Sequence, residues 1–148
     1  LKGVTMAGVS GGFVGAADLG VPLDPAALVK IGGMLGAGGI IVHDDSRCMV
    51  RAARACMAFF AAESCGKCFP CRIGTTRATE ILAGMATGAT RPDALRELED
   101  LCNVMGEASA CGLGLAAPFV VRSLERYWPD EVRAHLEGRC VAGECERR

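Results

Sequence analysis

The chain has 148 residues, of which 51% are hydrophobic and 22% charged, and its formal net charge is −1. This balance is typical of a globular protein with one domain or two small ones, and it argues against disorder. No basic patch is available for nucleic acid or an anionic membrane, and no apolar stretch reaches the roughly 18 residues of a membrane helix. We therefore expect neither nucleic-acid binding nor membrane insertion.

Residues 1–45 are rich in glycine and predict a small α+β unit. The stretch GVTMAGVSGGFVG favours one or two short strands with a double-glycine turn between them. PLDPAALVKIGG predicts a short helix. Asp24 is its expected cap, Pro25 is its first residue, and the glycines end it. GGIIVHDD predicts one more short strand. The N-terminus has no signal-peptide pattern and resembles the middle of a longer polypeptide.

From Ser46 onward the apolar residues follow a helical period, and Ser46 is the expected cap of the first helix. The predicted inward faces carry Met49, Ala53, Cys56, Met57, Phe60, Ala78, Ile81, Leu82, Met85, Leu95, Leu98, Leu101, Cys102, Met105, Val120, Val121, Leu124 and Tyr127. Four or five helices with short links form a small bundle. The sequence thus predicts a mainly α protein: an α+β fragment over 1–45, a helical bundle over 46–138 and a cysteine-containing tail over 139–148.

The stretch ESCGKCFPC gathers Cys65, Cys68 and Cys71 on one tight turn of backbone. Three thiolates at this spacing suit a cubane iron–sulfur cluster, whereas zinc usually takes its ligands as two separated pairs. A bacterial ferredoxin run would place a fourth cysteine at the position of Thr75, so the fourth ligand must come from elsewhere. Cys111, in SACGLG on a predicted loop, is the best candidate, because the glycines beside it permit close backbone approach.

Other chemistries compete for the same cysteines. A lone C-x2-C pair is often half of a structural zinc site or a redox dithiol, but a thioredoxin-like dithiol needs a βαβ setting and the flanks here are helical. Lys67 and Arg72 supply positive charge beside what would be an anionic cluster. Cys56 and Cys102 lie on apolar helix faces and are interpreted as small buried side chains. The triple run favours the cluster.

These motifs resemble a known family. ESCGKCFPCRIGT followed by SACGLG is similar to the C-terminal cluster domain of the NADH-oxidising flavoprotein subunit of respiratory complex I. The same module occurs in NAD(P)-linked and electron-bifurcating hydrogenases and in NAD-dependent formate dehydrogenases. GGMLGAGGIIVHDDSRCMV resembles that family's passage from a β-grasp domain into the helical bundle, so the likeness covers nearly the whole chain. It implies a β-grasp-like start and one [4Fe-4S] cluster, whose ligands would be Cys65, Cys68, Cys71 and Cys111.

The resemblance also implies an electron-transfer function. The cluster would take single electrons from a reduced FMN nearby and pass them to a partner's iron–sulfur chain, with a [2Fe-2S] subunit among the partners. The family binds FMN and NADH on a larger N-terminal domain with glycine-rich loops, and this sequence contains no match to those loops. FMN and NAD(P) are therefore expected in the parent complex but not on this chain. No catalytic residue is assigned, and the chain is not expected to oxidise NADH alone.

The tail, HLEGRCVAGECERR, places Cys140 and Cys145 after the last predicted helix, with His135 five residues before the first of them. It resembles the C-P-A-G-x-C stretch of NADP-reducing and electron-bifurcating hydrogenase subunits, with Val141 in place of the proline. Two thiols and an imidazole form a zinc half-site, and Cys48 is the expected fourth ligand. Alternatively, His135 covers the end of an amphipathic helix, and the tail thiols are free or lead into a further cluster domain.

Two further functions remain open from the sequence. One is a structural zinc protein that acts as an interaction module, although the crowded triple run of cysteines argues against it. The other is a thiol–disulfide enzyme, which would need no metal. The odd count of nine cysteines argues against a fully disulfide-bonded secreted scaffold, so we expect a reducing compartment, the cytoplasm.

Overall fold

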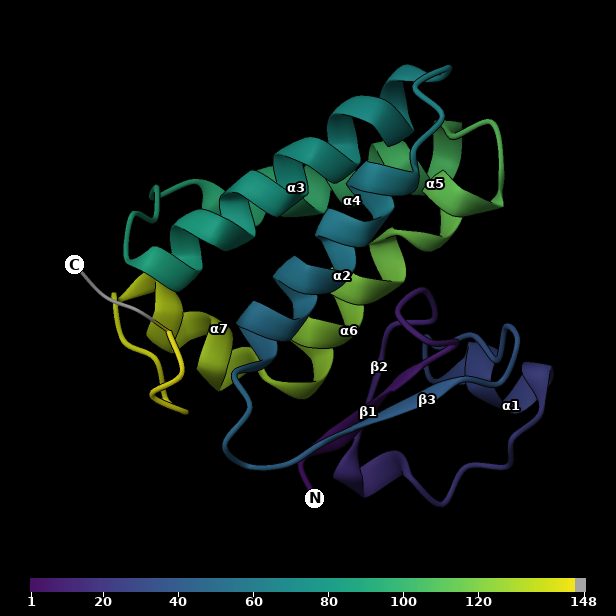
Figure 1. Cartoon of the computed structure of the whole chain (residues 1–148), viewed down its shortest axis with the longest axis horizontal. Coiled ribbons are helices and arrows are strands. Elements are labelled where there is room, and N and C mark those ends of the chain that lie inside the picture. The colour runs from purple at the N-terminus through teal and green to yellow at the C-terminus, as the bar shows by residue number, and fades with distance from the viewer. Residues whose placement is uncertain (146–148) are drawn as a thin grey trace.

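The structure is a computed structural model that describes residues 1–145, and a small sheet lies against one side of a bundle of helices (Figure 1). The sheet contains the antiparallel strands β1 (Gly3–Met6), β2 (Phe13–Gly15) and β3 (Ile40–His43) in the order β2-β1-β3. Between β2 and β3 lie the 3-10 turn η1 (Ala16–Asp18) and helix α1 (Pro25–Lys30). The short strands predicted in the glycine-rich opening are confirmed.

The bundle accounts for most of the chain. It consists of α2 (Met49–Glu63), α3 (Phe69–Thr87), α4 (Ala94–Ala108), α5 (Gly112–Ala116), α6 (Pro118–Tyr127) and α7 (Pro129–Leu136). The predicted fold class, mainly α with a short α+β fragment, is confirmed. The long antiparallel helices α2 and α3 pack against each other, and α7 lies at the end of the bundle near the described end of the tail (Figure 1).

Local signals in the sequence explain several helix ends. The Asp24 carboxylate accepts the Ala27 N–H at 3.0 Å, so Asp24 caps α1 as predicted. Gly88 ends α3 with a φ of 77°, a left-handed conformation that favours glycine. Most of the predicted inward residues are buried, including Met49, Leu82 and Leu124 in the core of the bundle. Three of them, Leu95, Leu101 and Tyr127, are half-buried.

Two local predictions are wrong. Helix α2 begins at Met49 rather than after Ser46, because the Ser46 N–H and hydroxyl both donate to Asp44 Oδ1 and form a turn instead of a cap. Cys111 lies outside any helix, as predicted, but the segment after it is the short helix α5 rather than loop, and the glycine-rich sequence did not indicate that helix. Both differences place a cysteine directly before a helix: Cys48 before α2 and Cys111 before α5.

The sheet is fixed to the bundle through Phe13, which is fully buried. The Phe13 N–H donates to Ser123 Oγ on α6 at 2.8 Å, and the Trp128 ring meets the Phe13 ring edge-on at a centroid distance of 5.8 Å. Gly3 allows the close approach of that tryptophan, since a Cβ at residue 3 would stand 2.8 Å from its ring. The sheet is thereby held against α6 and the tryptophan that follows it.

Among residues 1–145, no helix is both long enough and apolar enough to cross a membrane.

Candidate metal and cluster sites

The first cysteine group lies where α2, α3 and α5 meet. Cys65 is in the turn between α2 and α3, Cys68 immediately precedes α3, and Cys71 is in the first turn of that helix. Cys111 immediately precedes α5, which packs against α3. Figure 1 shows α5 beside the turn that joins α2 to α3. Two segments about forty residues apart therefore bring their cysteines to the same end of the bundle.

Backbone N–H groups converge on Cys68. The N–H groups of Ala110 and then Cys71 hydrogen-bond to its sulfur, and they hold the pKa of this thiol below its ordinary value. The bond from Ala110 ties the Cys111 segment to the triple-cysteine turn directly. Cys68 is also at the N-terminus of the long helix α3, whose dipole favours a negative charge there. The thiolate form of Cys68 is thus favoured.

The cysteines of the first group differ in their exposure to solvent. Cys65 and Cys111 are exposed, whereas Cys71 is buried and its sulfur lies 3.4 Å from Ser64 Oγ. Arg72 donates to the Gly66 carbonyl at 2.8 Å and stacks on the Phe69 ring, so it holds the turn in shape. The positive charge predicted at Arg72 therefore also has a structural role.

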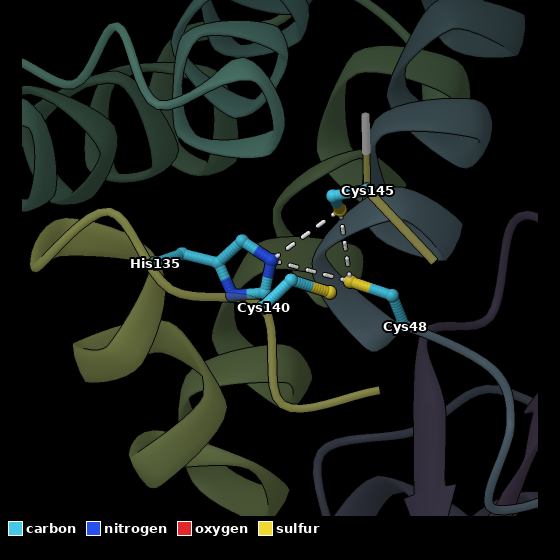
Figure 2. A group of neighbouring side chains, drawn as sticks. All are labelled: Cys48, His135, Cys140 and Cys145. Atoms are coloured by element: carbon cyan, nitrogen blue, oxygen red, sulfur yellow. Dashed lines mark hydrogen bonds between the residues drawn. The ribbon is translucent and has the colours of Figure 1, made fainter. Parts of the chain in front are cut away.

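The second group consists of Cys48, His135, Cys140 and Cys145, whose ligand atoms all lie within 4.8 Å of one another. The Cys48 sulfur is 3.3 Å from His135 Nε2 and 3.5 Å from the Cys145 sulfur, and His135 Nε2 is 3.5 Å from Cys145. Figure 2 shows the side chains pointing toward one another from the residue before α2, from α7 and from the tail. The structure brings together the four residues that the sequence analysis grouped.

His135 is buried and oriented by α7 itself. Its Nδ1 lies 2.7 Å from the Glu131 carbonyl oxygen, which can only accept, so Nδ1 carries the proton and Nε2 is left as the acceptor that faces the thiols. A second partner of this kind commonly fixes the ring of a metal-ligating histidine. His135 therefore fills the end of α7 and also presents Nε2 to the thiols of Cys48 and Cys145.

Within the second group, the spacing among Cys48, His135 and Cys145 is close to that of ligands around a single tetrahedral ion. With zinc–sulfur and zinc–nitrogen bonds of about 2.3 and 2.0 Å, tetrahedral ligand atoms stand roughly 3.5–3.8 Å apart, close to the 3.3–3.5 Å observed. Without a metal, burial and then the neighbouring Cys48 thiol raise the pKa of the Cys145 thiol. A cation among the sulfurs would reverse this effect, because thiolates are the metal ligands.

Two glutamates that the sequence analysis did not single out hold the second group in place. Glu144 accepts the Cys48 N–H at 2.7 Å and pairs with Arg47 at 2.6 Å. Glu131, which is buried, accepts the Met49 N–H at 3.1 Å and pairs with Lys2. They satisfy the free N–H groups at the start of α2, a role that the sequence had given to Ser46. They could not be predicted from the local sequence around the start of α2, because both lie far from it along the chain.

The remaining two cysteines behave as predicted. Cys56 and Cys102 are buried in the core of the bundle, and burial raises the pKa of their thiols to about 11 and about 12. They belong to neither group. The described structure therefore divides the nine cysteines into four at the α2–α3 turn and α5, three beside His135, and two in the core.

The protein is a helical bundle with a short sheet, and a group of cysteines lies at each end of the bundle. Residues 51–135 match the family described as the NADH-ubiquinone oxidoreductase-F iron-sulfur binding region. The chain belongs to this family, as the motifs around Cys65 and Cys111 indicated.

Individual relatives agree with this assignment. The chain is 37% identical to the NADP-reducing hydrogenase subunit HndC of Solidesulfovibrio fructosivorans, over 97% of this chain and 30% of that protein. It is also 37% identical to an NADH-quinone oxidoreductase subunit of Rhizobium meliloti (strain 1021), over 94% of this chain and 33% of that protein. The chain thus spans about a third of the length of these relatives.

A solved structure has the same fold. An NAD+-reducing [NiFe]-hydrogenase in the H2-reduced state superimposes with a TM-score of 0.76 and 30% sequence identity. The match covers 91% of this chain and 23% of the hydrogenase chain. The likeness therefore includes both the sheet and the helical bundle.

Proposed function

We propose that this chain is an electron-transfer module that holds one [4Fe-4S] cluster on Cys65, Cys68, Cys71 and Cys111. The main support is the meeting of two separate cysteine segments at the N-terminal ends of α3 and α5, with the Ala110 N–H on the Cys68 sulfur. Membership of an iron–sulfur binding family supports the same group. The cluster, when bound, supplies one-electron chemistry.

The residues of the chain position the cluster and adjust its charge. The N-terminus of α3 and the converging N–H groups favour negative charge on the ligands. Cys65 and Cys111 lie at the surface, which would bring the cluster within reach of a neighbouring redox centre. Phe69 and Ile73, which are exposed on α3 beside the cysteines, offer apolar contact area for the part of the complex that carries this centre.

The parent assembly is proposed from the relatives. Their names describe a hydrogenase subunit and a quinone oxidoreductase subunit, so we place this chain in a multi-subunit NAD(P)-linked oxidoreductase. FMN and NAD(P) would bind outside this chain, and a [2Fe-2S] subunit would be a redox partner. The nine cysteines form no disulfide, which favours a reducing compartment such as the cytoplasm. We retain 1–45, 46–138 and 139–148 as the proposed division of the chain.

Metal analysis and spectroscopy test the cluster. Anaerobically purified protein should be brown, should contain about four irons and four sulfides per chain, and should give a cubane signal in electron paramagnetic resonance after reduction. Cys68→Ser and Cys111→Ser should both lose or alter that signal. Cys102→Ala is the matched control, because Cys102 is a buried cysteine of the core. Iron-free wild-type protein, or an unchanged signal in Cys111→Ser, would contradict the assignment.

The second group supports a second proposal, a structural zinc ion bound by Cys48, His135, Cys140 and Cys145. Its support is the compact geometry, in which the ligand atoms lie within 4.8 Å of one another and the His135 ring is fixed by Glu131. Such a site is too tight for four irons and suits a closed tetrahedral ion. The zinc would fasten the tail to the start of α2.

Zinc can be distinguished from iron in the same preparation. Elemental analysis should find one zinc per chain in addition to the iron, and Cys48→Ser should reduce the zinc content alone. Replacement of zinc by cobalt(II) should produce the visible bands of a tetrahedral thiolate site. Protein that contains iron but never zinc would show that these are free thiols, and zinc retained in full by Cys48→Ser would exclude Cys48 as a ligand.

A further inference from the structure

Ser109 has a buried hydroxyl that no other part of the described structure explains. It lies between α4 and α5, two residues before Cys111. Its Oγ is buried and has no hydrogen-bond partner anywhere in residues 1–145, and no other buried side-chain oxygen or nitrogen in that range is in this state. Buried polar groups are almost always hydrogen-bonded, so an unpaired hydroxyl indicates a partner that belongs to a bound group.

The hydroxyl lies next to the first cysteine group. A Cβ on Gly114 would overlap Ser109 Oγ and would stand only 2.9 Å from Cys71 Cβ. The side chains of Ser109 and Cys71 therefore face the same small space, which exists because residue 114 has no side chain. Directly after α2, Ser64 Oγ is 3.4 Å from the Cys71 sulfur and also accepts the Gly66 N–H. Of the two serines beside Cys71, Ser109 alone has no hydrogen-bond partner in the described structure.

If a cluster is bound, a hydroxyl in this position can donate a hydrogen bond to one of its thiolate or sulfide sulfurs. Cluster sulfurs accept hydrogen bonds, and a reduced cluster carries one more negative charge than an oxidised one, so a donor stabilises the reduced state more. Removing such a donor therefore lowers the reduction potential without removing a ligand. Ser109 itself is not placed to replace a cysteine in the first group, because the four thiols already complete the set.

We propose that the Ser109 hydroxyl donates a hydrogen bond to a sulfur of the cluster on its Cys71 side and thereby raises the cluster's reduction potential. The proposal rests on the [4Fe-4S] site proposed above. It assigns Ser109 as a residue that tunes the cluster, and it explains why residue 114 lacks a side chain.

Redox titration of purified protein tests the assignment. Ser109→Ala should keep its iron and sulfide, and its cluster should be harder to reduce. At a fixed solution potential the ratio of reduced to oxidised cluster should fall roughly tenfold, which for a one-electron couple equals about 59 mV. Ser109→Thr, which keeps the hydroxyl, should remain close to the wild type. Thr79→Ala is the matched control, since its hydroxyl donates to the Thr75 carbonyl farther along α3 and its loss should leave the potential unchanged.

The outcomes separate this inference from the proposed function. Wild-type protein without iron would remove the basis of both. A fully loaded Ser109→Ala protein with an unchanged potential would overturn the role of Ser109 and leave the cluster assignment intact. If Ser109→Ala takes up no iron, the pair Ser109→Thr and Ser109→Val decides, because valine copies the shape of threonine without the hydroxyl. Equal potentials in that pair would refute the proposal, and a lower potential in Ser109→Val alone would support it.

Discussion

The two cysteine groups of this protein differ in how they are built. The group formed by Cys65, Cys68, Cys71 and Cys111 is partly exposed, and it lies on a turn and on the first residues of helices. The group around His135 is compact, and its ligand atoms converge within 4.8 Å from parts of the chain up to 97 residues apart. An open group suits a redox centre that must exchange electrons, and a closed group suits an ion that only holds structure.

The difference also concerns what each group does for stability. The first group ties two neighbouring parts of the bundle together, and the helices around it already share an extensive core. A metal ion at the second group would fasten the tail, whose Cys140, Ala142 and Cys145 are only partly buried against the core, back to the start of α2. We therefore expect metal loss to affect redox function at the first group and global stability at the second. The following predictions test that contrast.

The largest expected effect on stability follows loss of the second group. Double replacement Cys140→Ser/Cys145→Ser should release the zinc and leave the iron in place. A cross-link between residues 97 positions apart lowers the entropy of the unfolded chain and so stabilises the fold by up to about 4.7 kcal/mol. Its loss should therefore lower the thermal midpoint clearly. Denaturant titration, metal analysis and limited proteolysis of the tail measure the outcome. Loss of iron together with zinc would break the proposed independence of the two groups.

The next largest effect concerns the glutamate that supports the second group. Glu131→Ala removes the acceptor of the Met49 N–H and the partner of Lys2, both of which are largely buried. Leaving such groups unpaired should lower the free energy of unfolding by about 2 kcal/mol. Glu137→Ala is the control, because the Glu137–Arg139 pair is exposed and exposed pairs contribute little. Equal destabilisation of the two variants would contradict this role of Glu131.

A smaller effect on stability, with a larger effect on iron content, is expected at the first group. Gly114→Ala would push into Ser109 and Cys71, so the protein should lose most of its iron while the rest of the bundle stays folded. Gly112→Ala is the matched control, because a Cβ at residue 112 meets no atom within 4 Å. Iron analysis and circular dichroism distinguish the two. Similar iron contents in both variants would show that the tight packing at Gly114 is unimportant for the cluster.

The smallest expected effect is a difference in thiol reactivity between the cysteines of the two groups and the two core cysteines. Burial raises the pKa of Cys56 to about 11 and of Cys102 to about 12, so at pH 8 both thiols stay protonated and unreactive toward iodoacetamide. Mass spectrometry of folded, metal-free protein should therefore find alkylation in the two groups before it appears at these positions. Raising the pH toward 11 increases the thiolate fraction and should speed their reaction only where the core opens. Rapid labelling of Cys102 at pH 8 would contradict its burial.

Much of the fold could be predicted because its signals are local. The period of the apolar residues identified the helices, and Asp24 before Pro25 marked the start of α1. Helix α5 was missed because GLGLA contains too few residues and too much glycine to signal a helix. The start of α2 was misplaced because its N–H groups are satisfied by Glu131 and Glu144, which lie far away in the sequence.

The sequence by itself determined which residues can carry the chemistry, because thiol spacing on a single turn is a local property of the chain. It identified the triple cysteine run, the SACGLG motif and the H-x4-C-x4-C tail, and with them the family. Only the tertiary structure decided that Cys48 and Cys145 lie 3.5 Å apart, and that the Ser109 hydroxyl is left without a partner beside Cys71. Those facts depend on how helices pack, which brings together residues that no local pattern relates.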